Sequence, residues 1–374
     1  MGAEDKMEQT YTLTLTESCN LSCVYCYEHN RNGRSMPLNV AKSILNEAFK
    51  STQQGDLLTI DFFGGEPFLE FEKIKMIVEY VKASAKENRL KSSYRFFATT
   101  NGTLVHGAVQ DWLRNNPNFH VGLSLDGNKY MQNINRSNSF DQIDLDFFSS
   151  MYPKQPIKMT ISDKTLSHLA EGVIFCHSKG FEVSCNLAYG INWADSCYTG
   201  QFEKQLDVLI SFYLKHPDIK PCSLLNRKLA VIGAKKDKPT IQRWCGAGTA
   251  MHTYDCDGTY YPCQFFMPIS CGEEKSKMSK TIQFHKEVPT SLLDEKCRQC
   301  LVKDACPTCY GFNYCESGNI YKKNDAQCIL EKRTFYANAC FFIQRWDANQ
   351  LPGIPENELL ASLIGAKSII EQFA

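Results

Sequence analysis

Tyr11–Cys26 reads YTLTLTESCNLSCVYC, a strand-like stretch that runs directly into a cysteine-bearing loop. Apolar or aromatic side chains alternate with hydroxyl side chains through Tyr11–Thr16, and such alternation predicts a β-strand. The loop after it carries Cys19, Cys23 and Cys26, with three and then two residues between them. The sequence therefore predicts that a strand delivers three closely spaced thiols to one end of a sheet.

Beyond this stretch, strand-like and helix-like segments take turns up to about residue 214. The expected strands are Tyr11–Thr16, Leu57–Phe63, Tyr94–Thr99, Phe119–Leu125, Pro156–Ile161 and Glu182–Leu187. The expected helices are Val40–Phe49, Phe71–Lys86, Val105–Asn115, Ile143–Met151, Leu166–Lys179 and Phe202–Leu214. Such alternation predicts a parallel sheet and an α/β fold. We place a partial (βα)6 barrel at residues 1–220.

Residues 221–374 form a second expected domain, in which the periodic pattern breaks into turns rich in Gly, Pro and Cys. A region of this kind is expected to fold around bound metals. Its tail returns to helix at Arg333–Arg345 and at Glu356–Phe373. The second of these helices is amphipathic, and its leucines, among them Leu360, are expected to pack against the body of the protein.

The amino-acid composition limits which partners and which cellular compartment are expected for the chain. The 41 basic and 41 acidic side chains cancel, so neither nucleic acid nor a membrane surface is an expected partner. We find neither a signal peptide nor an apolar run long enough to span a bilayer, and we expect a cytoplasmic protein. The 18 cysteines of this 374-residue chain therefore indicate metal binding, because disulfides are rare in a reducing compartment.

The first cysteine group suits an iron–sulfur cubane, because three thiolates leave one of its irons open to a small molecule. With Tyr25 just before Cys26, the motif resembles the signature of the radical S-adenosylmethionine (radical SAM) superfamily. The resemblance implies a [4Fe–4S] cluster on Cys19, Cys23 and Cys26 whose open iron binds the amino and carboxylate groups of S-adenosylmethionine. It also implies that Tyr25 lies against the adenine. The alternative is a zinc site, with His29 as the fourth ligand.

Two further segments follow the second and third expected strands, where parallel α/β folds bind ligands. The first consists of Gly64, Gly65, Glu66 and Pro67. It looks like the GGEP motif of the family, which the resemblance associates with the methionine amine. The second is the turn Thr100-Asn101-Gly102, and we expect Asn101 to lie at the cofactor. A plain turn is the alternative.

The fourth expected strand ends in a similar group. Ser124 and Asp126 flank its end, and their hydroxyl and carboxylate suit the ribose or the ammonium group of S-adenosylmethionine. Arg136 lies a little further on and suits a carboxylate, which a guanidinium binds with two parallel hydrogen bonds. We expect Ser124 and Arg136 to bind the cofactor and Asp126 to be catalytic. Each is otherwise an ordinary surface group.

The C-terminal cysteines resemble the SPASM extension, which carries two auxiliary iron–sulfur clusters. The candidate ligands are Cys245, Cys263, Cys297, Cys300, Cys306, Cys309, Cys315 and Cys328. The resemblance implies one cluster on Cys297, Cys300, Cys306 and Cys328, and another on Cys245, Cys263 and Cys309. The chain departs from the pattern at Cys306 and Cys309, which are separated by two residues where the family has three.

That departure leaves the second auxiliary cluster open. Cys315 is the candidate fourth ligand, an open iron is the alternative, and Cys256 and Cys222 are competing candidates. A pair of zinc knuckles is the alternative for the whole region. The expected cofactors are therefore three [4Fe–4S] clusters and S-adenosylmethionine.

The resemblance implies two activities. One is maturation of a ribosomally synthesised precursor peptide by a thioether or carbon-centred cross-link, and the other is anaerobic sulfatase maturation to formylglycine. Sulfatase-maturing enzymes carry an Asp base after the second SPASM cysteine, whereas this chain has Gln264, whose amide cannot accept that proton. We therefore expect a peptide maturase that uses an electron donor such as flavodoxin or ferredoxin. A non-enzymatic iron–sulfur electron carrier is the third alternative.

Overall fold

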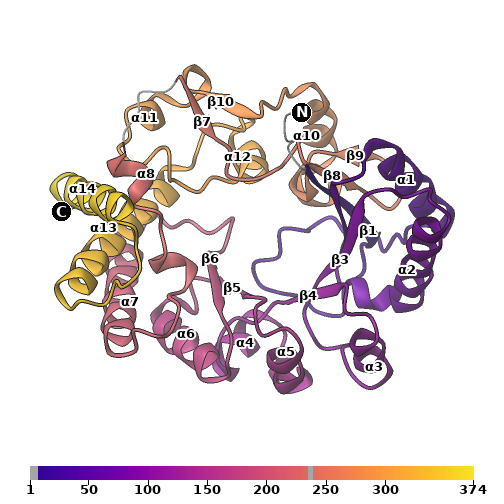
Figure 1. Cartoon of the computed structure of the whole chain (residues 1–374), viewed down its shortest axis with the longest axis horizontal. Coiled ribbons are helices and arrows are strands. Elements are labelled where there is room, and N and C mark those ends of the chain that lie inside the picture. The colour runs from indigo at the N-terminus through magenta and orange to yellow at the C-terminus, as the bar shows by residue number, and fades with distance from the viewer. Residues whose placement is uncertain (1–6, 235–238) are drawn as a thin grey trace. The chain divides into compact units, whose positions relative to one another are not determined.

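The structure, a computed structural model, describes residues 7–234 and 239–374, which divide into two compact units (Figure 1). The first unit holds Arg136–Gln155 and Gly246–Phe284 together with the described residues up to Ser124. The second holds the described parts of Leu125–Asn135, Pro156–Cys245 and His285–Ala374. These units are defined by packing, so the expected domain boundary at residue 220 stays a prediction.

Every strand and helix that the sequence predicts is present, with shifts at the ends. The strands are β1 Glu8–Thr16, β2 Leu57–Gly64, β3 Ser93–Thr100, β4 Phe119–Leu123, β5 Ile157–Ile161, β6 Val183–Leu187, β7 Thr240–Gln242, β8 Met251–Tyr254, β9 Tyr260–Tyr261 and β10 Glu287–Pro289. The first seven helices are α1 Leu38–Ser51, α2 Phe71–Lys86, α3 Ala108–Arg114, α4 Lys129–Asn135, α5 Leu145–Met151, α6 Leu169–Ser178 and α7 Ser196–Lys215. The remaining helices are α8 Ala230–Gly233, α9 Pro268–Cys271, α10 Glu273–Met278, α11 Glu295–Arg298, α12 Tyr310–Ser317, α13 Asp325–Asp347 and α14 Glu356–Phe373.

A sheet in the order β4-β3-β2-β1-β8-β9 forms the centre of the first unit. The strands from β1 to β4 pair in parallel, as the sequence predicts, with Thr12 opposite Asp61. The other neighbour of β1 is β8, which also runs parallel to it. Sequence reasoning missed this pairing, because β8 is short and lies in the Cys-rich region far along the chain.

The two faces of this sheet differ because successive side chains of a strand point to opposite sides. One face carries buried apolar side chains, such as Leu13, Ile60 and Phe96, and Figure 1 shows α1 and α2 alongside these strands. The other face carries polar side chains. Here Asp61 and Arg95 help to line a cavity of ≈ 430 Å³. The α/β class and the parallel sheet are therefore confirmed, and the unit offers a polar face.

The second unit contains the parallel pair β5 and β6, with Met159 opposite Cys185. Its helical core lies between α8, α13 and α14, where Ile232, Phe335 and Ile369 are buried together. Sequence reasoning missed α4, which spans only Lys129–Asn135 and follows β4 closely.

The helix α14 has the expected bounds but packs through a different face. Its buried residues include Gly365 and Ala366, whereas Leu360 is 59% exposed. A Cβ at Gly365 would lie 2.4 Å from the carbonyl oxygen of Leu229, and one at Gly233 of α8 would lie 1.8 Å from the carbonyl oxygen of Ala361. The backbones of α8 and α14 can therefore approach this closely only because Gly233 and Gly365 have no side chain at the contact. The expectation that Leu360 packs inward is wrong.

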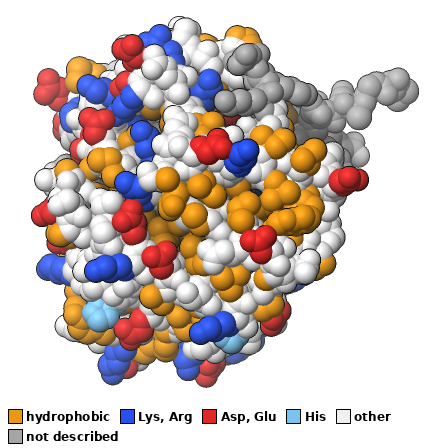
Figure 2. Space-filling view, turned by 90° about the vertical axis from the view of Figure 1, so that its left-hand side faces the viewer, with side chains coloured by type: hydrophobic (Ala, Val, Ile, Leu, Met, Phe, Trp, Pro, Cys, Tyr) orange, Lys and Arg blue, Asp and Glu red, His pale blue; other side chains and the backbone are white. Residues whose placement is uncertain are grey.

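Acidic and basic side chains are interspersed over the face in Figure 2, which also shows hydrophobic side chains gathered near its centre. Single-sign charge therefore does not dominate that face, in keeping with the equal numbers of acidic and basic side chains. Among the described residues, no helix combines the length and the apolar character that crossing a membrane requires.

Candidate cluster and cofactor site

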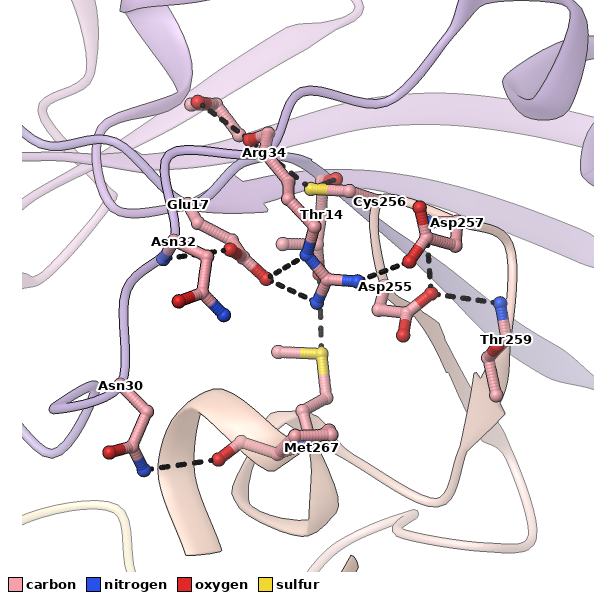
Figure 3. A network of polar contacts seen from close by, with 12 residues as sticks. Thr14, Glu17, Asn30, Asn32, Arg34, Asp255, Cys256, Asp257, Thr259 and Met267 are labelled. Carbon is pink, nitrogen blue, oxygen red and sulfur yellow. Dashed lines mark hydrogen bonds and ion pairs between the residues drawn. The ribbon is translucent and has the colours of Figure 1, made fainter. Parts of the chain in front are cut away.

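An ion pair between buried Glu17 and partly exposed Arg34 closes the cluster loop, which we define as residues 18–33. Glu17 is 2% exposed and its Oε1 accepts a hydrogen bond of 3.0 Å from Nε of Arg34, while its Oε2 accepts the backbone N–H of Asn32 at 3.1 Å (Figure 3). The guanidinium of Arg34 also pairs with Asp257. The hydrogen bond to Glu17, ahead of other causes, holds the pKa of Arg34 above its usual range. These contacts tie both ends of the loop to β1 and to the segment after β8.

Inside the loop, the cysteine sulfurs receive hydrogen-bond donors from the chain. Nη2 of Arg31 lies 2.8 Å from Sγ of Cys26, and the backbone nitrogen of Leu21 lies 3.5 Å from Sγ of Cys19. Nη1 of Arg136 lies 3.9 Å from Sγ of Cys23. Donors of this kind suit thiolates that bind iron. The three sulfurs therefore fit a cluster whose ligands come from this loop.

A single-ion site has less support. Across residues 7–234 and 239–374, no three His, Cys, Asp or Glu side chains are grouped closely enough to bind one metal ion. Cubane ligands need no such convergence, because each thiolate binds its own iron. His29, the fourth ligand of the zinc alternative, is exposed, and its backbone nitrogen donates to the carbonyl of Ile269 at 3.0 Å.

The GGEP segment packs against the start of the cluster loop. The backbone nitrogens of Gly65 and Glu66 donate to the carbonyls of Thr16 and Ser18, each at 3.0 Å. A Cβ at Gly65 would lie 2.4 Å from the Ser18 oxygen and 2.8 Å from Cβ of Cys19, so a larger residue would displace the first cysteine. Pro67 begins the single turn of 3-10 helix that follows.

The carboxylate of Glu66 is fully buried and points into the protein. It accepts hydrogen bonds from the Thr100 hydroxyl at 2.8 Å and from the backbone nitrogens of Asn101 at 2.8 Å and Phe68 at 3.1 Å. Burial, opposed by these bonds, raises the pKa of Glu66 to about 7. The side chain therefore joins the ends of β2 and β3. A contact between Gly64–Pro67 and the methionine amine would have to use their backbone.

Asn101 connects the end of β3 to the cluster loop. Its Nδ2 donates to Oδ1 of Asn20 at 2.9 Å and lies 4.0 Å from Sγ of Cys19. The Thr103 hydroxyl donates to Oδ1 of Asn101 at 2.7 Å, and Nδ2 of Asn20 donates to that hydroxyl at 2.8 Å. The turn therefore does more than reverse the chain, because it holds the first cysteine of the triad in place.

Arg136 and Tyr25 meet beside the second cysteine. The guanidinium carbon of Arg136 lies 5.4 Å from the centre of the Tyr25 ring, within reach of a cation–π contact. Arg136 is 8% exposed, and its charge also acts on buried Glu66. Ser124 is 8% exposed, and its backbone nitrogen donates to the carbonyl of Thr100 at 2.9 Å. These expected cofactor residues all belong to the first unit.

Asp126, the expected catalytic residue, lies in the second unit. It is fully buried, and its two oxygens accept the backbone N–H of Thr160 at 2.9 Å and the side-chain amide of Asn135 at 3.1 Å. Its own backbone nitrogen donates to Gln132 at 2.8 Å. In this geometry the carboxylate joins β5 to α4. Its catalytic role stays a prediction.

Four C-terminal cysteines of the second unit influence one another electrostatically. Burial, together with the charges of Cys328 and Cys300, raises the pKa of Cys297. Burial and the charge of Cys300 likewise raise the pKa of Cys306. Nζ of buried Lys323 lies 3.4 Å from Sγ of Cys306. A buried ammonium beside these sulfurs compensates negative charge, so the set fits the first auxiliary cluster that the SPASM resemblance implies.

The ligands expected for the second auxiliary cluster belong to both units. Cys245 and Cys309 lie in the second unit, where the charge of Cys245 acts on Cys309. Cys315 lies on α12 in the same unit. Cys263 belongs to the first unit, one residue before Gln264. The Gln264 side chain is hydrogen-bonded to half-buried Tyr27, which follows Cys26 in the cluster loop.

The two competing cysteines have partners of their own. Cys256 is buried, and its thiol donates to the carbonyl of Thr14 at 3.2 Å (Figure 3). Burial raises the pKa of Cys256 to about 12, which keeps it a protonated donor. Cys222 is buried beside Cys185, and this neighbour, ahead of other causes, holds the pKa of Cys222 below its usual value. Both side chains therefore pack in the interior of their own unit.

Comparison with known proteins agrees with this geometry. A sequence model described as the radical SAM superfamily matches residues 13–144, the part that contains the cluster loop and the GGEP segment. The chain contains a radical SAM domain. It is therefore an enzyme of radical SAM type, and that superfamily implies a [4Fe–4S] cluster and S-adenosylmethionine. Its C-terminal cysteines are consistent with a SPASM region.

Relatives of this radical SAM enzyme include a cysteine-type anaerobic sulfatase-maturating enzyme of Clostridium novyi. It is 24% identical over 336 residues, which cover 81% of this chain and 85% of the relative. An uncharacterized protein of Methanocaldococcus jannaschii is 28% identical over 167 residues, which cover 43% of this chain and 56% of that protein.

Solved structures share the fold. Native anSMEcpe with bound AdoMet and Cp18Cys peptide superposes with a TM-score of 0.65 at 19% identity, covering 91% of this chain and 98% of that one. Streptococcus suis SuiB bound to precursor peptide SuiA gives a TM-score of 0.52 at 15% identity, covering 86% and 76%.

Sequence reasoning missed several residues of the radical SAM domain and its extension. Arg31 lies within the motif region, and its basic side chain next to the triad was an available signal. Arg34 and Tyr27 are also close in sequence, but their partners Asp257 and Gln264 are far along the chain. Lys323 had no sequence signal, because only folding brings it to Cys306.

Proposed function

We propose that this radical SAM enzyme is a peptide maturase, which removes hydrogen from a residue of a ribosomally synthesised precursor peptide and closes a cross-link. Bound at Cys19, Cys23 and Cys26, a [4Fe–4S] cluster and S-adenosylmethionine would supply a 5′-deoxyadenosyl radical for this abstraction. Arg136 lies beside Tyr25 and Cys23, and this position supports the proposal that it binds the carboxylate of S-adenosylmethionine.

The first unit has a polar cavity on one face of its sheet, lined by threonines together with Asp61, Arg95 and His120. Arg95 donates to the Thr59 hydroxyl at 2.9 Å, and the Thr12 hydroxyl donates to Asp61 at 3.0 Å. Arg95 and His120 lie near the starts of β3 and β4, whereas the cluster loop follows the end of β1. Support for a peptide substrate comes instead from solved structures that share this fold and hold a peptide, Cp18Cys or the precursor SuiA.

Gln264 is the observation that favours cross-linking over formylglycine formation. A general base must reach the proton and must be able to hold it. The Gln264 amide cannot hold a proton, and it is engaged with Tyr27, whose ring stacks on Phe265 at 4.2 Å between centroids. Burial raises the pKa of Tyr27 well above its usual value, so the phenol is not a substitute base at neutral pH.

Anaerobic sulfatase maturation remains the second candidate, because relatives named for that activity match about four-fifths of this chain, with 81% covered in the case of Clostridium novyi. Both activities act on a peptide and need S-adenosylmethionine. The two candidate activities differ in their product, which carries an aldehyde in one case and a new bond between residues in the other.

The test uses the full chain, reconstituted anaerobically with iron, sulfide and S-adenosylmethionine and reduced by dithionite or by flavodoxin or ferredoxin. We expect no aldehyde, by hydrazine trapping, on a sulfatase-derived peptide with Cys at the target position. Gln264→Asp supplies a carboxylate that can accept the proton. Gln264→Ala removes the amide without supplying a base and is the matched control. Aldehyde formed by the parent enzyme would overturn the peptide-maturase proposal.

The positive arm requires a precursor peptide, for which we would test any short Cys-containing peptide found to be encoded beside this chain. We expect mass spectrometry to show a product lighter by two hydrogens for each cross-link, with loss of thiol alkylation where the bond is a thioether. An unmodified peptide, in a reaction that does form 5′-deoxyadenosine, would contradict cross-linking of that precursor.

A further inference from the structure

Tyr189 occupies a loop position that no motif marks. It follows β6 and packs its ring on Phe312 of α12, with the ring centres 4.2 Å apart and the planes inclined by 25°. Both residues belong to the second unit. The stack places the Tyr189 hydroxyl at Cys309, to which it is hydrogen-bonded.

The sulfur of Cys309 accepts more donors than an ordinary thiol does. Cys309 caps the N-terminus of α12, where the backbone nitrogen of Phe312 lies 3.4 Å from its Sγ. The backbone N–H of Gly311 and the hydroxyl of Tyr189 are hydrogen-bonded to it as well. A neutral thiol is a weak acceptor, whereas a thiolate attracts several donors. Burial, ahead of these hydrogen bonds, raises the pKa of the Cys309 thiol, so the donors suit a sulfur that is a thiolate because it binds iron.

Cys245 lies in the same surroundings. After burial, the negative charge of Cys245 is among the causes that raise the pKa values of Cys309, Tyr189 and Tyr310. Arg243, two residues before Cys245, places its guanidinium carbon 4.8 Å from the centre of the Tyr310 ring. Two cysteines from distant parts of the chain thus lie near each other, among hydrogen-bond donors and close to a positive charge.

We infer that the Tyr189 hydroxyl donates to the Cys309 thiolate of an auxiliary cluster that includes Cys245, and that it raises the reduction potential of that cluster. The inference deepens the proposed function, on which it rests, by naming a residue that tunes electron acceptance when the cross-link closes. A hydrogen bond to a ligating sulfur withdraws negative charge and favours the reduced cluster. Tyr189 is thus a positioning residue.

The test is Tyr189→Phe, which keeps the ring on Phe312 and removes only the hydroxyl. Both enzymes are built in a background where Cys19, Cys23 and Cys26 are Ala, so that only auxiliary clusters contribute to the spectrum. We expect equal iron content and a lower midpoint potential for one cluster in a redox titration followed by electron paramagnetic resonance. An unchanged potential would overturn the inference and leave the proposed function standing.

Tyr336→Phe is the matched control, because the Tyr336 hydroxyl is hydrogen-bonded to Cys340, a cysteine outside the expected ligands. We expect this variant to leave both potentials unchanged, and a shift as large as that of Tyr189→Phe would overturn the inference. Electron–nuclear double resonance in D2O gives a second readout. An exchangeable proton coupled to the cluster in the parent and lost in Tyr189→Phe supports the inference, and its absence from the parent contradicts it. A parent chain without auxiliary clusters would instead overturn the cluster assignment itself.

Discussion

At the scale of single residues, the site depends on side chains that hold the cluster loop as well as on the cysteines. Buried Glu17 and partly exposed Arg34 close the loop, and the exposed Asp257 extends the pair to the segment after β8. Arg34 serves both carboxylates through separate nitrogens, which a lysine cannot do. A residue outside the motif therefore fixes the geometry of the motif.

Arg34→Lys is expected to loosen the cluster loop, because one ammonium cannot replace the guanidinium fork and Glu17 stays buried. A hydrogen bond to a charged group contributes about 1.5–3 kcal/mol. We expect the reconstituted variant to lose iron to a chelator several-fold faster than the parent enzyme, as followed by absorbance. Arg89→Lys is the control, since Arg89 pairs with Glu87 at the surface. Equal rates for Arg34→Lys and the parent would show that the ion pair does not hold the loop.

At the scale of elements, close backbone approach decides how α14 docks. The sequence suggests a leucine-rich stripe as the packing face, yet the structure turns Gly365 and Ala366 inward and leaves Leu360 exposed. Gly233 and Gly365 permit contact between α8 and α14 that any side chain would block. Hydrophobic periodicity alone cannot reveal this, because it says nothing about the distance between two backbones.

Gly365→Ala is expected to destabilise the second unit, since its Cβ would meet backbone of Leu229 that cannot move aside cheaply. Overpacking of this kind costs about 1–3 kcal/mol. We expect a lower midpoint of thermal unfolding under anaerobic conditions. Gly200→Ala in α7 is the matched control, because nothing lies within 4 Å of its Cβ position. That change is expected to leave the midpoint unchanged or raise it, through better helix propensity. A midpoint for Gly365→Ala equal to that of the parent would contradict the close packing.

At the scale of the whole molecule, the cysteines group into three sets. The triad lies in the cluster loop of the first unit, Cys297, Cys300, Cys306 and Cys328 lie together in the second unit, and Cys245 lies close to Cys309. Each set has its own donors: Arg31 for the triad, Lys323 for the second and Tyr189 for the third. This grouping supports the proposal of three clusters per chain.

Anaerobic reconstitution is expected to load close to three [4Fe–4S] clusters. A cubane takes three or four thiolates. The first two sets supply three and four, and Cys263 and Cys315 are the candidates that would complete the third set of Cys245 and Cys309. Replacing Cys19, Cys23 and Cys26 together by Ala should remove one cluster of iron and abolish 5′-deoxyadenosine formation. Replacing the buried pair Cys185 and Cys222 by Ala is the control, and we expect its iron content to match the parent. Stoichiometric zinc with only one cluster would show that the C-terminal region binds zinc.

Much of the fold follows from local patterns in the sequence. Alternation in YTLTLT predicts β1, and the spacing of Ile74, Ile77, Val78 and Val81 predicts α2, because strand and helix periods arise from backbone geometry. The Cys-x3-Cys-x2-Cys spacing likewise identifies the radical SAM domain, since a short loop carries all three cysteines. Short α4 and β8 were missed, because a few residues show no reliable period.

The sequence by itself determined the α/β class, the parallel sheet and the cysteine triad, which depend on residues close together along the chain. Only the tertiary structure decided that β8 pairs with β1, that Glu66 faces inward, and that Tyr189 reaches Cys309. These contacts join segments separated by long stretches of chain. Their partners are selected by packing and by the need to satisfy buried polar groups, and neither leaves a local pattern in the sequence.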